Sequence, residues 1–353
     1  MSDNYHDDVK RENVTRVREK LKELPPFMES FFIGIADTKS PRTRSVYADD
    51  IKLFFMFLIE NAELFKGLSL KTFSIESLEQ VTAEDIERFL EYISYYTAVL
   101  KGGGIRSRSN DACGKSRKLA AVRTMFSYFC KKRRISSNPA ELVDFPAVKE
   151  KAIIKLEVDE VARLLDEVES GENLTGRGKA FHAITKARDL AIITLLLGTG
   201  MRVSECVGIN VEHMDFNVNA VKVTRKGGNE AVIYFGEEVA DAVLGYMKER
   251  EKITPVAGNE NALFLSIQRK RMGNQAIRIL VKKYSKMVTT LKNITPHKLR
   301  STFGTALYNE TSDIYIVADV LGHADVNTTR KRYAAMSDER RRAAAKAVKL
   351  RED

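Results

Sequence analysis

Residues 188–235, RDLAIITLLLGTGMRVSECVGINVEHMDFNVNAVKVTRKGGNEAVIYF, join an apolar segment to two short segments in which polar and apolar residues alternate. The apolar run over residues 188–197 predicts a buried helix. Residues 220–224 and 231–235 alternate as strands do, and residues 226–229, Lys-Gly-Gly-Asn, supply the turn between them. The stretch therefore predicts a mainly helical domain that contains a small antiparallel sheet.

The residues before this stretch predict a second helical region and a boundary. The spacing of apolar residues predicts a helix over 158–168. Two prolines and a charge cluster interrupt the helical pattern between Asn138 and Leu156. Upstream, residues 46–60, 83–100 and 115–131 carry apolar stripes at helical spacing, the second after Thr82 as N-cap. The glycine- and serine-rich segment between the last two predicts an exposed basic loop. A chain of 353 residues with this organisation predicts two domains.

The charge of the chain favours a polyanionic partner. Its formal net charge is +10, and each phosphate that a cation neutralises releases condensed counterions. Other basic proteins share this property, so charge alone does not establish nucleic-acid binding.

The cysteines and the N-terminus bear on the compartment. Cys113, Cys130 and Cys206 form no C-x-x-C pair, which predicts neither a disulfide framework nor a zinc site but small packed thiols in a reducing compartment. The N-terminus has no apolar core of a signal peptide, and no run of about 18 apolar residues occurs. We therefore expect a soluble, cytoplasmic protein without a membrane partner.

Two candidate functional residues lie in the opening stretch. Arg202 stands beside Glu205, just after an apolar helix that ends at glycines, and Lys226 lies at the predicted turn, where it can face a ligand. Taken alone, each has a simpler interpretation, a surface arginine after a helix C-cap and a solvated turn lysine.

Residues 295–305, TPHKLRSTFGT, predict a helix that begins at a phosphate-binding end. Thr295 suits the N-cap and Pro296 the first helical position. His297 and Arg300, three apart, share one face of the first turn, where backbone N–H groups and the helix dipole favour a phosphate. The same dipole disfavours imidazolium, which leaves His297 able to accept a proton. The alternative is a capped helix with a structural histidine.

Residues 321–333, LGHADVNTTRKRY, place His323 after a glycine at a helix end. Asn327 or Thr328 can cap the next helix, which carries Tyr333. The alternative for Tyr333 is a half-buried ring that only packs.

Taken together, these segments resemble a known signature. The matching residues are Arg202 in TGMRVSE, His297 and Arg300 in HKLR, His323 in LGH, and Tyr333 ten residues later. In order, flanking residues and separation they resemble the tyrosine recombinases of the phage-integrase and Xer-type superfamily, over most of residues 155–340. Ser301 and Gly304 depart from the residues frequent in the family at positions without a chemical role. The hairpin RKGGN matches the G-K-G turn of the family loosely, so Arg225 and Lys222 remain alternatives to Lys226.

The resemblance implies a two-domain DNA-breaking and rejoining architecture. A SAM-like helical DNA-binding domain precedes a catalytic domain that is mainly α with a small antiparallel β-sheet. Residues 40–58 and 116–139 resemble the start and the last helix of the family's core-binding domain. The expected parts are a charged extension over 1–25, the core-binding domain over 26–145, a linker over 146–157, the catalytic domain over 158–336 and a tail helix over 337–353.

The resemblance also implies the chemistry. Tyr333 attacks a DNA backbone phosphate and forms a 3′-phosphotyrosine with a free 5′-hydroxyl. Arg202 and Arg300 bind the two non-bridging oxygens, because planar guanidinium forks match them. His297 takes the tyrosine proton or holds the phosphate, His323 donates a hydrogen bond to a non-bridging oxygen, and Lys226 protonates the departing 5′-oxygen. Glu205 orients a cationic neighbour. This reaction needs neither metal nor nucleotide cofactor, and the sequence has no Walker A motif.

The expected partners are double-stranded DNA with paired recombination sites and further copies of the chain. The tail over 337–353 docks into a neighbouring protomer in a cyclic tetramer on DNA, with a monomer or weak dimer in its absence. The family places such enzymes on the nucleoid. The candidate phosphate contacts are Arg42, Arg44, Arg106, Arg108, Lys115, Arg117, Lys118 and Arg123. We expect about half of them to touch DNA. A type IB topoisomerase and a catalytically silent DNA-binding regulator remain alternatives.

Overall fold

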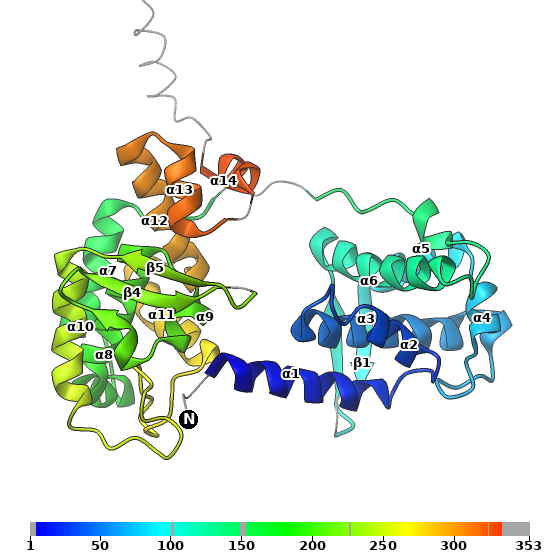
Figure 1. The fold of residues 1–353 in the computed structure, drawn as a ribbon, viewed down its shortest axis with the longest axis horizontal. Coiled ribbons are helices and arrows are strands. Elements are labelled where there is room, and N and C mark those ends of the chain that lie inside the picture. The colour runs from blue at the N-terminus through cyan, green and yellow to red at the C-terminus, as the bar shows by residue number, and fades with distance from the viewer. Residues whose placement is uncertain (1–4, 100–101, 149–152, 226, 324, 334–353) are drawn as a thin grey trace, which may run out of the picture. The chain divides into compact units, whose positions relative to one another are not determined.

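The computed structural model describes residues 5–99, 102–148, 153–225, 227–323 and 325–333. The chain divides into two compact units, one of residues 7–151 and one of residues 1–6 with 152–353. Figure 1 shows the elements of each unit. None of the helices in these described ranges has the length and apolar character needed to span a membrane.

The N-terminal unit is built from helices and one hairpin. Its elements are α1 (Tyr5–Leu21), α2 (Met28–Gly34), α3 (Pro41–Asn61), the 3₁₀ helix η1 (Glu63–Phe65), α4 (Ile75–Glu79), α5 (Ala83–Tyr92), β1 (Tyr95–Val99), β2 (Ile105–Ser109), α6 (Ala112–Lys131) and η2 (Pro139–Leu142).

Side-chain caps set the starts of α3, α4, α5 and α6. Ser40 accepts a hydrogen bond from the backbone N–H of Thr43, and Thr82 and Asp85 form a capping box at α5. A core rich in phenylalanine holds α2, α3, α5 and α6 together; its fully buried rings include Phe31, Phe54, Phe55, Phe89, Phe126 and Phe129. The charged N-terminal stretch forms α1, which contributes Val17 to this core.

The prediction of one helix over residues 83–100 followed by a loop is wrong. The helix ends at Tyr92, and residues 95–99 pair antiparallel with residues 105–109, with Tyr96 opposite Arg108. The reason lies in the residues, because Tyr95, Tyr96 and Thr97 favour strands and Gly102 and Gly103 supply the positive φ angles of the turn.

The C-terminal unit combines helices with a three-stranded sheet. Its elements are α7 (Val158–Ser170), α8 (Arg177–Thr199), α9 (Val203–Gly208), η3 (Val211–His213), β3 (Met214–Asp215), β4 (Ala220–Thr224), β5 (Glu230–Tyr234), α10 (Glu237–Arg250), α11 (Asn274–Val288), α12 (Pro296–Thr311), α13 (Ile314–Leu321) and α14 (Val326–Tyr333).

The sheet of this unit is antiparallel with the order β3-β4-β5, and Val221 lies opposite Ile233. Both side chains are buried in one core with Ile192 and Leu195 of α8 and Val243 of α10. The prediction of a mainly helical chain with a small antiparallel sheet in its C-terminal half is confirmed.

The cysteines follow the prediction in two of three cases. Cys206 is buried, and this burial raises the pKa of its thiol. Cys130 is half-buried. Cys113 is exposed, because it lies in the first turn of α6 on the outward side.

Candidate active site

The end of α8 brings the chain to Arg202 through a left-handed glycine. Gly200 has φ +61°, and a Cβ there would collide with Phe303 and lie 2.9 Å from Leu321 Cδ2. Only glycine allows the helix to end this close to α12 and α13. Arg202 follows as the residue before α9.

Arg202 is held on three sides. Its backbone N–H donates to Glu205 Oε2 (2.7 Å), its Nη1 to Glu205 Oε1 (2.8 Å) and its Nη2 to the carbonyl of Gly322 (3.0 Å). The Glu205 side chain is 2% exposed, whereas that of Arg202 is 34% exposed. A buried carboxylate therefore orients a guanidinium that still reaches the surface, which a plain surface arginine does not do.

Arg300 lies beneath the surface on α12. It is 3% exposed, and its Nη1 donates to the carbonyl of Gly200 (2.8 Å) while its Nη2 donates to the carbonyl of Leu321. These bonds join the end of α8 to the end of α13 through one side chain. The predicted start of the helix at Pro296 is confirmed, although the Thr295 hydroxyl does not cap the first turn.

His297 differs from Arg300 in exposure, although both lie near the start of α12. His297 is exposed and lines a hollow of about 500 Å³ between the start of α12 and the face of α11. Arg278 and Lys282 of α11, both exposed, line the same hollow. Neither residue was predicted from the sequence, although their i, i+4 spacing on one face of an amphipathic helix is a signal for them.

His323 joins α13 to α14. Gly322 has φ +62°, and the His323 N–H donates to the carbonyl of Ala318 (2.9 Å) in a helix-ending turn. A 2.7 Å hydrogen bond joins His323 Nδ1 to Oγ1 of Thr329, which is fully buried on α14. This bond fixes the imidazole ring against the helix that ends at Tyr333.

The start of α14 differs from the expectation. The helix begins at Val326, and Asp325 Oδ1 accepts the N–H of Asn327 (2.9 Å), so neither Asn327 nor Thr328 is the cap. Aspartate is an equally good cap, and Asp325 directly precedes the helix, whereas Asn327 and Thr328 lie within its first turn. The backbone of Tyr333 ends α14, but its side chain is outside the described part of the structure.

The hairpin between β4 and β5 contributes Arg225. Lys226 lies outside the described residues. Of the two alternatives to it, Lys222 pairs with Glu230 (2.9 Å) on the strands, whereas Arg225 Nη2 donates to the carbonyl of Val320 (3.3 Å). Arg225 is therefore the described hairpin cation that lies beside the end of α13.

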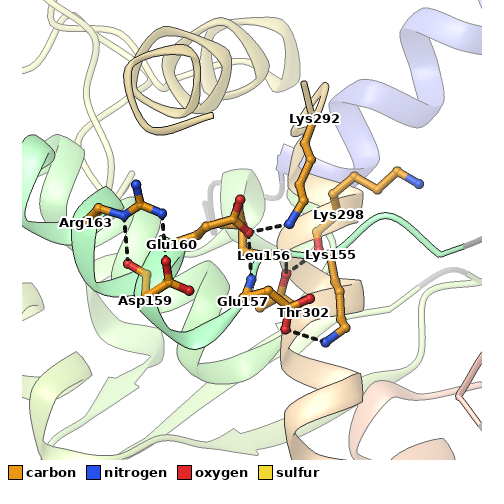
Figure 2. A network of polar contacts seen from close by, with 9 residues as sticks. All are labelled: Lys155, Leu156, Glu157, Asp159, Glu160, Arg163, Lys292, Lys298 and Thr302. Carbon is orange, nitrogen blue, oxygen red and sulfur yellow. Dashed lines mark hydrogen bonds and ion pairs between the residues drawn. The ribbon is translucent and has the colours of Figure 1, made fainter. Parts of the chain in front are cut away.

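A polar network fixes α12 from the side of the chain that enters the C-terminal unit (Figure 2). The Leu156 N–H donates to Thr302 Oγ1 (2.9 Å), and the Thr302 hydroxyl donates to the carbonyl of Lys298 (3.0 Å). Glu160 Oε2 accepts from the Glu157 N–H (2.8 Å) and from Lys292 Nζ. The residues at the end of the predicted linker thus bind the helix that carries His297 and Arg300.

The basic residues expected to contact DNA from the N-terminal unit fall into two groups. Arg42, Arg106, Arg108 and Arg117 are exposed, and Arg44, Lys115 and Arg123 are half-buried. Arg106 and Arg108 point outward from β2, where every residue is exposed.

Lys118 and Arg123 have partners inside the unit. Lys118 is 5% exposed and donates to Asn110 Oδ1 (2.8 Å), so it offers no surface to DNA in this structure. Its burial lowers the pKa of the amine despite the nearby carboxylate of Asp50. Arg123 donates to the carbonyls of Ala140 (3.0 Å) and Val143 and lies over the Phe145 ring.

Among the described residues, no three or more histidine, cysteine, aspartate or glutamate side chains lie together as ligands. The polar groups that converge at the end of α13 are cationic and suit an anion.

The chain is similar to known recombinases along most of its length. A family model described as the phage integrase family matches residues 155–340. The tyrosine recombinase XerC of Caldanaerobacter subterraneus is 31% identical over 333 residues, which cover 91% of this chain and 86% of that protein. The XerC of Syntrophus aciditrophicus is 30% identical over 324 residues, which cover 90% and 93%.

Solved structures share the fold at lower identity. A XerH recombinase bound to a palindromic difH substrate in a post-cleavage complex matches with a TM-score of 0.64 and 18% identity, over 94% of this chain and 88% of that one. A lambda integrase dimer bound to a COC′ core site matches with a TM-score of 0.59 and 16% identity, over 86% and 96%. With the arginines and His323 gathered at the end of α13, these matches show that the chain belongs to the phage integrase family, the tyrosine-type site-specific recombinases that cleave and rejoin DNA.

Proposed function

We propose that Arg202, Arg300 and His323 bind the scissile phosphate and that Tyr333 is the nucleophile. The observation that carries this proposal is that Arg202 and Arg300, nearly 100 positions apart, donate to the adjacent carbonyls of Gly322 and Leu321. His323 follows these two residues directly. Two guanidiniums and an imidazole therefore meet within one turn of chain, and Tyr333 follows His323 by ten residues, at the end of α14.

The charge of the reaction accounts for the two arginines. Negative charge grows on the phosphorus oxygens as the phenolic oxygen approaches, and fixed guanidiniums stabilise that charge without reorganising. Glu205 keeps Arg202 oriented through two hydrogen bonds. Its role is support, because its carboxylate is buried and would repel a phosphate.

The remaining step is proton transfer. The bond from Tyr333 to phosphorus forms while the bond from phosphorus to the 5′-oxygen breaks, which leaves a 3′-phosphotyrosine and a 5′-hydroxyl. We assign acceptance of the phenolic proton to His297, which is exposed at the start of α12, and protonation of the 5′-oxygen to Lys226. Attack by the 5′-hydroxyl of a partner strand reverses the step, so rejoining needs no external energy source.

The substrate we propose is duplex DNA with paired recombination sites, used for integration, excision or dimer resolution. The support is the name of the curated relatives, tyrosine recombinase XerC, and the solved structures of XerH on difH and of lambda integrase on a core site. On the protein side we assign phosphate contacts to Arg106 and Arg108 of β2 and to Arg278 and Lys282 beside the hollow at His297.

The assembly we propose is a tetramer on DNA in which residues 337–353, outside the described part of the chain, dock on a neighbouring copy. Closed rings of this kind let one protomer regulate the tyrosine of the next. The division into a core-binding domain over 26–145 and a catalytic domain over 158–336 belongs to the same proposal.

The test is capture of the covalent intermediate. Cells that express the wild-type chain are lysed in denaturant, and protein that carries a covalent DNA strand is purified and its DNA sequenced. We expect the strand ends to map to one site and to depend on Tyr333. Random ends, or no adduct, would contradict the proposal. Two marked duplexes with the mapped site then give joint products if the chain recombines, and only relaxed single circles if it acts as a topoisomerase.

A further inference from the structure

Three arginines from three separate elements donate to three consecutive carbonyls at the end of α13. Arg225 of the β4–β5 hairpin donates to Val320, Arg300 of α12 to Leu321, and Arg202 before α9 to Gly322; the acceptors are the residues 320–322. The C-terminal end of a helix carries partial negative charge on its last carbonyls, which attracts cations. This end therefore gathers the hairpin cation into the same cluster as the two arginines assigned to the phosphate.

Arg225 differs from the other two in how it is held. Arg202 is paired with Glu205, and Arg300 has a second carbonyl partner, Gly200. Arg225 makes one long bond, 3.3 Å to Val320, and its Nε is buried without a hydrogen-bond partner among the described residues. Contact with the backbone of Gly322 holds it instead.

That contact depends on glycine. A Cβ on Gly322 would overlap Nη1 and Cζ of Arg225, so the guanidinium lies directly over the Gly322 backbone. The φ of +62° at Gly322 is also one that other residues rarely adopt. The turn before His323 thus leaves a space that the Arg225 side chain fills.

The hairpin turn itself is closed by its own backbone. The Arg225 N–H donates to the carbonyl of Asn229 (2.7 Å), and the Gly228 N–H donates to the carbonyl of Arg225 (3.1 Å). Arg225 is therefore both the base of the turn and the side chain that attaches it to the residues before His323.

We infer that Arg225 is a positioning residue: it anchors the β4–β5 hairpin to the Val320–His323 segment, and proton donation to the leaving 5′-oxygen, which we assign to Lys226, depends on this anchor. The inference rests on the proposed role of Lys226 and Tyr333. A direct role for Arg225 on the phosphate charge is the competing interpretation. Anchoring is favoured because Arg225 alone of the three arginines closes the hairpin turn with its own backbone, at Asn229 and Gly228, while its side chain contacts Val320 and Gly322.

The first test measures the anchor without activity. Hydrogen exchange of the DNA-free protein, followed by mass spectrometry, is compared for wild type, Arg225→Ala, Arg202→Ala and Arg163→Ala. Arg163 is an exposed arginine of α7 that pairs only with Asp159 among the contacts described, and it serves as the matched surface control. We expect Arg225→Ala alone to accelerate exchange in peptides covering residues 225–229. Unchanged exchange there overturns the anchor.

The second test separates proton donation from charge stabilisation. Nicked duplexes with the site mapped from the covalent adduct carry either the normal 5′-bridging oxygen or a sulfur at the scissile phosphate. A thiolate leaves without a proton donor, so a variant that has lost only proton donation regains its rate on sulfur. We expect Arg225→Ala and Lys226→Ala to slow cleavage about 100-fold or more on oxygen and to come within about threefold of wild type on sulfur. Arg202→Ala should stay slow on both.

The outcomes distinguish the anchoring role of Arg225 from the proton-donor role of Lys226. The inference is overturned if Arg225→Ala cleaves both duplexes equally slowly, or if it is not slowed on the duplex with the normal oxygen. If Arg225→Ala regains its rate on sulfur and Lys226→Ala does not, Lys226 is not the proton donor. Arg225 then remains a positioning residue. Arg225→Lys keeps a donor that reaches a carbonyl but lacks the planar fork, so an intermediate rate on oxygen supports the anchor. Thermal melting of each variant confirms that it is folded.

Discussion

The backbone N–H of Leu156 donates to the hydroxyl of Thr302 over 2.9 Å, so the chain that enters the C-terminal unit is bound to the helix of His297 and Arg300 (Figure 2). The bond is buried, and Thr302 also donates to the carbonyl of Lys298. A single hydroxyl thus satisfies a backbone group on each of two segments.

Removal of this hydroxyl should destabilise the C-terminal unit. Thr302→Val keeps the shape of the side chain but leaves the buried Leu156 N–H without its acceptor, which costs about 1–3 kcal/mol. Urea unfolding measures the change. Thr305→Val is the matched control, because the Thr305 hydroxyl donates only to the carbonyl of Ser301 on its own helix. Equal losses for both variants would show that the link to Leu156 contributes nothing.

The ion pair between Glu160 and Lys292 should make stability depend on pH. Burial raises the pKa of Glu160, but hydrogen bonds from Lys292 and the Glu157 N–H and the charge of Lys292 outweigh burial, so the net pKa lies below its ordinary value. A depressed pKa stabilises the folded state above the pKa of the unfolded chain, about 4.3, and this contribution is lost as pH falls through the folded value.

We therefore expect Glu160→Gln to lower the free energy of unfolding by about 1 kcal/mol at pH 7. The difference from wild type should shrink below about pH 4.5, where both chains carry a neutral side chain at position 160. Denaturant midpoints between pH 4 and 7 measure it. A difference that grows toward acid would contradict the assignment.

Tyr333→Phe should separate binding from cleavage. The substitution removes only the phenolic oxygen, so the covalent adduct should disappear while the affinity for DNA changes less than about threefold. Filter binding and denaturing gels on the mapped duplex give the two quantities. A persistent adduct would show that another residue is the nucleophile.

Substitutions of Arg202 and Arg300, the two arginines that we assign to the phosphate, should lower the stability of the protein by different amounts. Arg202→Ala and Arg300→Ala should each slow cleavage by about 100-fold or more. Arg300→Ala should also lower the melting temperature clearly, because it leaves the carbonyls of Gly200 and Leu321 without their guanidinium donor at a site that is 3% exposed. Arg202→Ala alone leaves the buried Glu205 carboxylate without its guanidinium, so the comparison uses Arg202→Ala with Glu205→Gln, which removes that charge and should lower the melting temperature less. Similar melting temperatures would argue against the burial of Arg300 as the reason.

The hairpin arginines of the N-terminal unit should set part of the salt dependence. Arg106→Ala with Arg108→Ala removes two exposed cations from β2, so the slope of log affinity against log salt concentration should fall by about 2 if both contact phosphates. Arg88→Ala provides a control, because Arg88 is exposed and pairs with Glu84. An unchanged slope would place β2 away from DNA.

The sequence predicted the fold class because its periodicities were strong. The strand over residues 220–224 agrees with the structure, and the second strand is shifted by one residue to 230–234. The family residues were found because the chain keeps them in order. The β1–β2 hairpin was missed because alternation over residues 95–99 is weak, and its pairing with residues 105–109 across a glycine turn is not a helical or alternating pattern.

Other features of the site could not be predicted from the sequence because they depend on tertiary contacts. Nothing local indicates that Arg225 lies over Gly322, or that Arg278 and Lys282 share a hollow with His297. His297 and Arg300 were expected on one face, yet one is exposed and the other is buried, because the cover that α8 and α13 give to Arg300 is set by packing. Lys118 is likewise buried, and its amine donates to the side chain of Asn110, eight positions earlier.

The acceptors that align Arg202, Arg225 and Arg300 are peptide oxygens, which every amino acid carries. Substitutions of the side chains at Val320 and Leu321 can therefore accumulate during evolution without erasing the oxygens that orient the guanidiniums, provided the helix still ends at Gly322. The part of the proposed site most resistant to mutational drift is thus the main chain at the end of α13, and the residue that it most depends on is Gly322, which follows the helix.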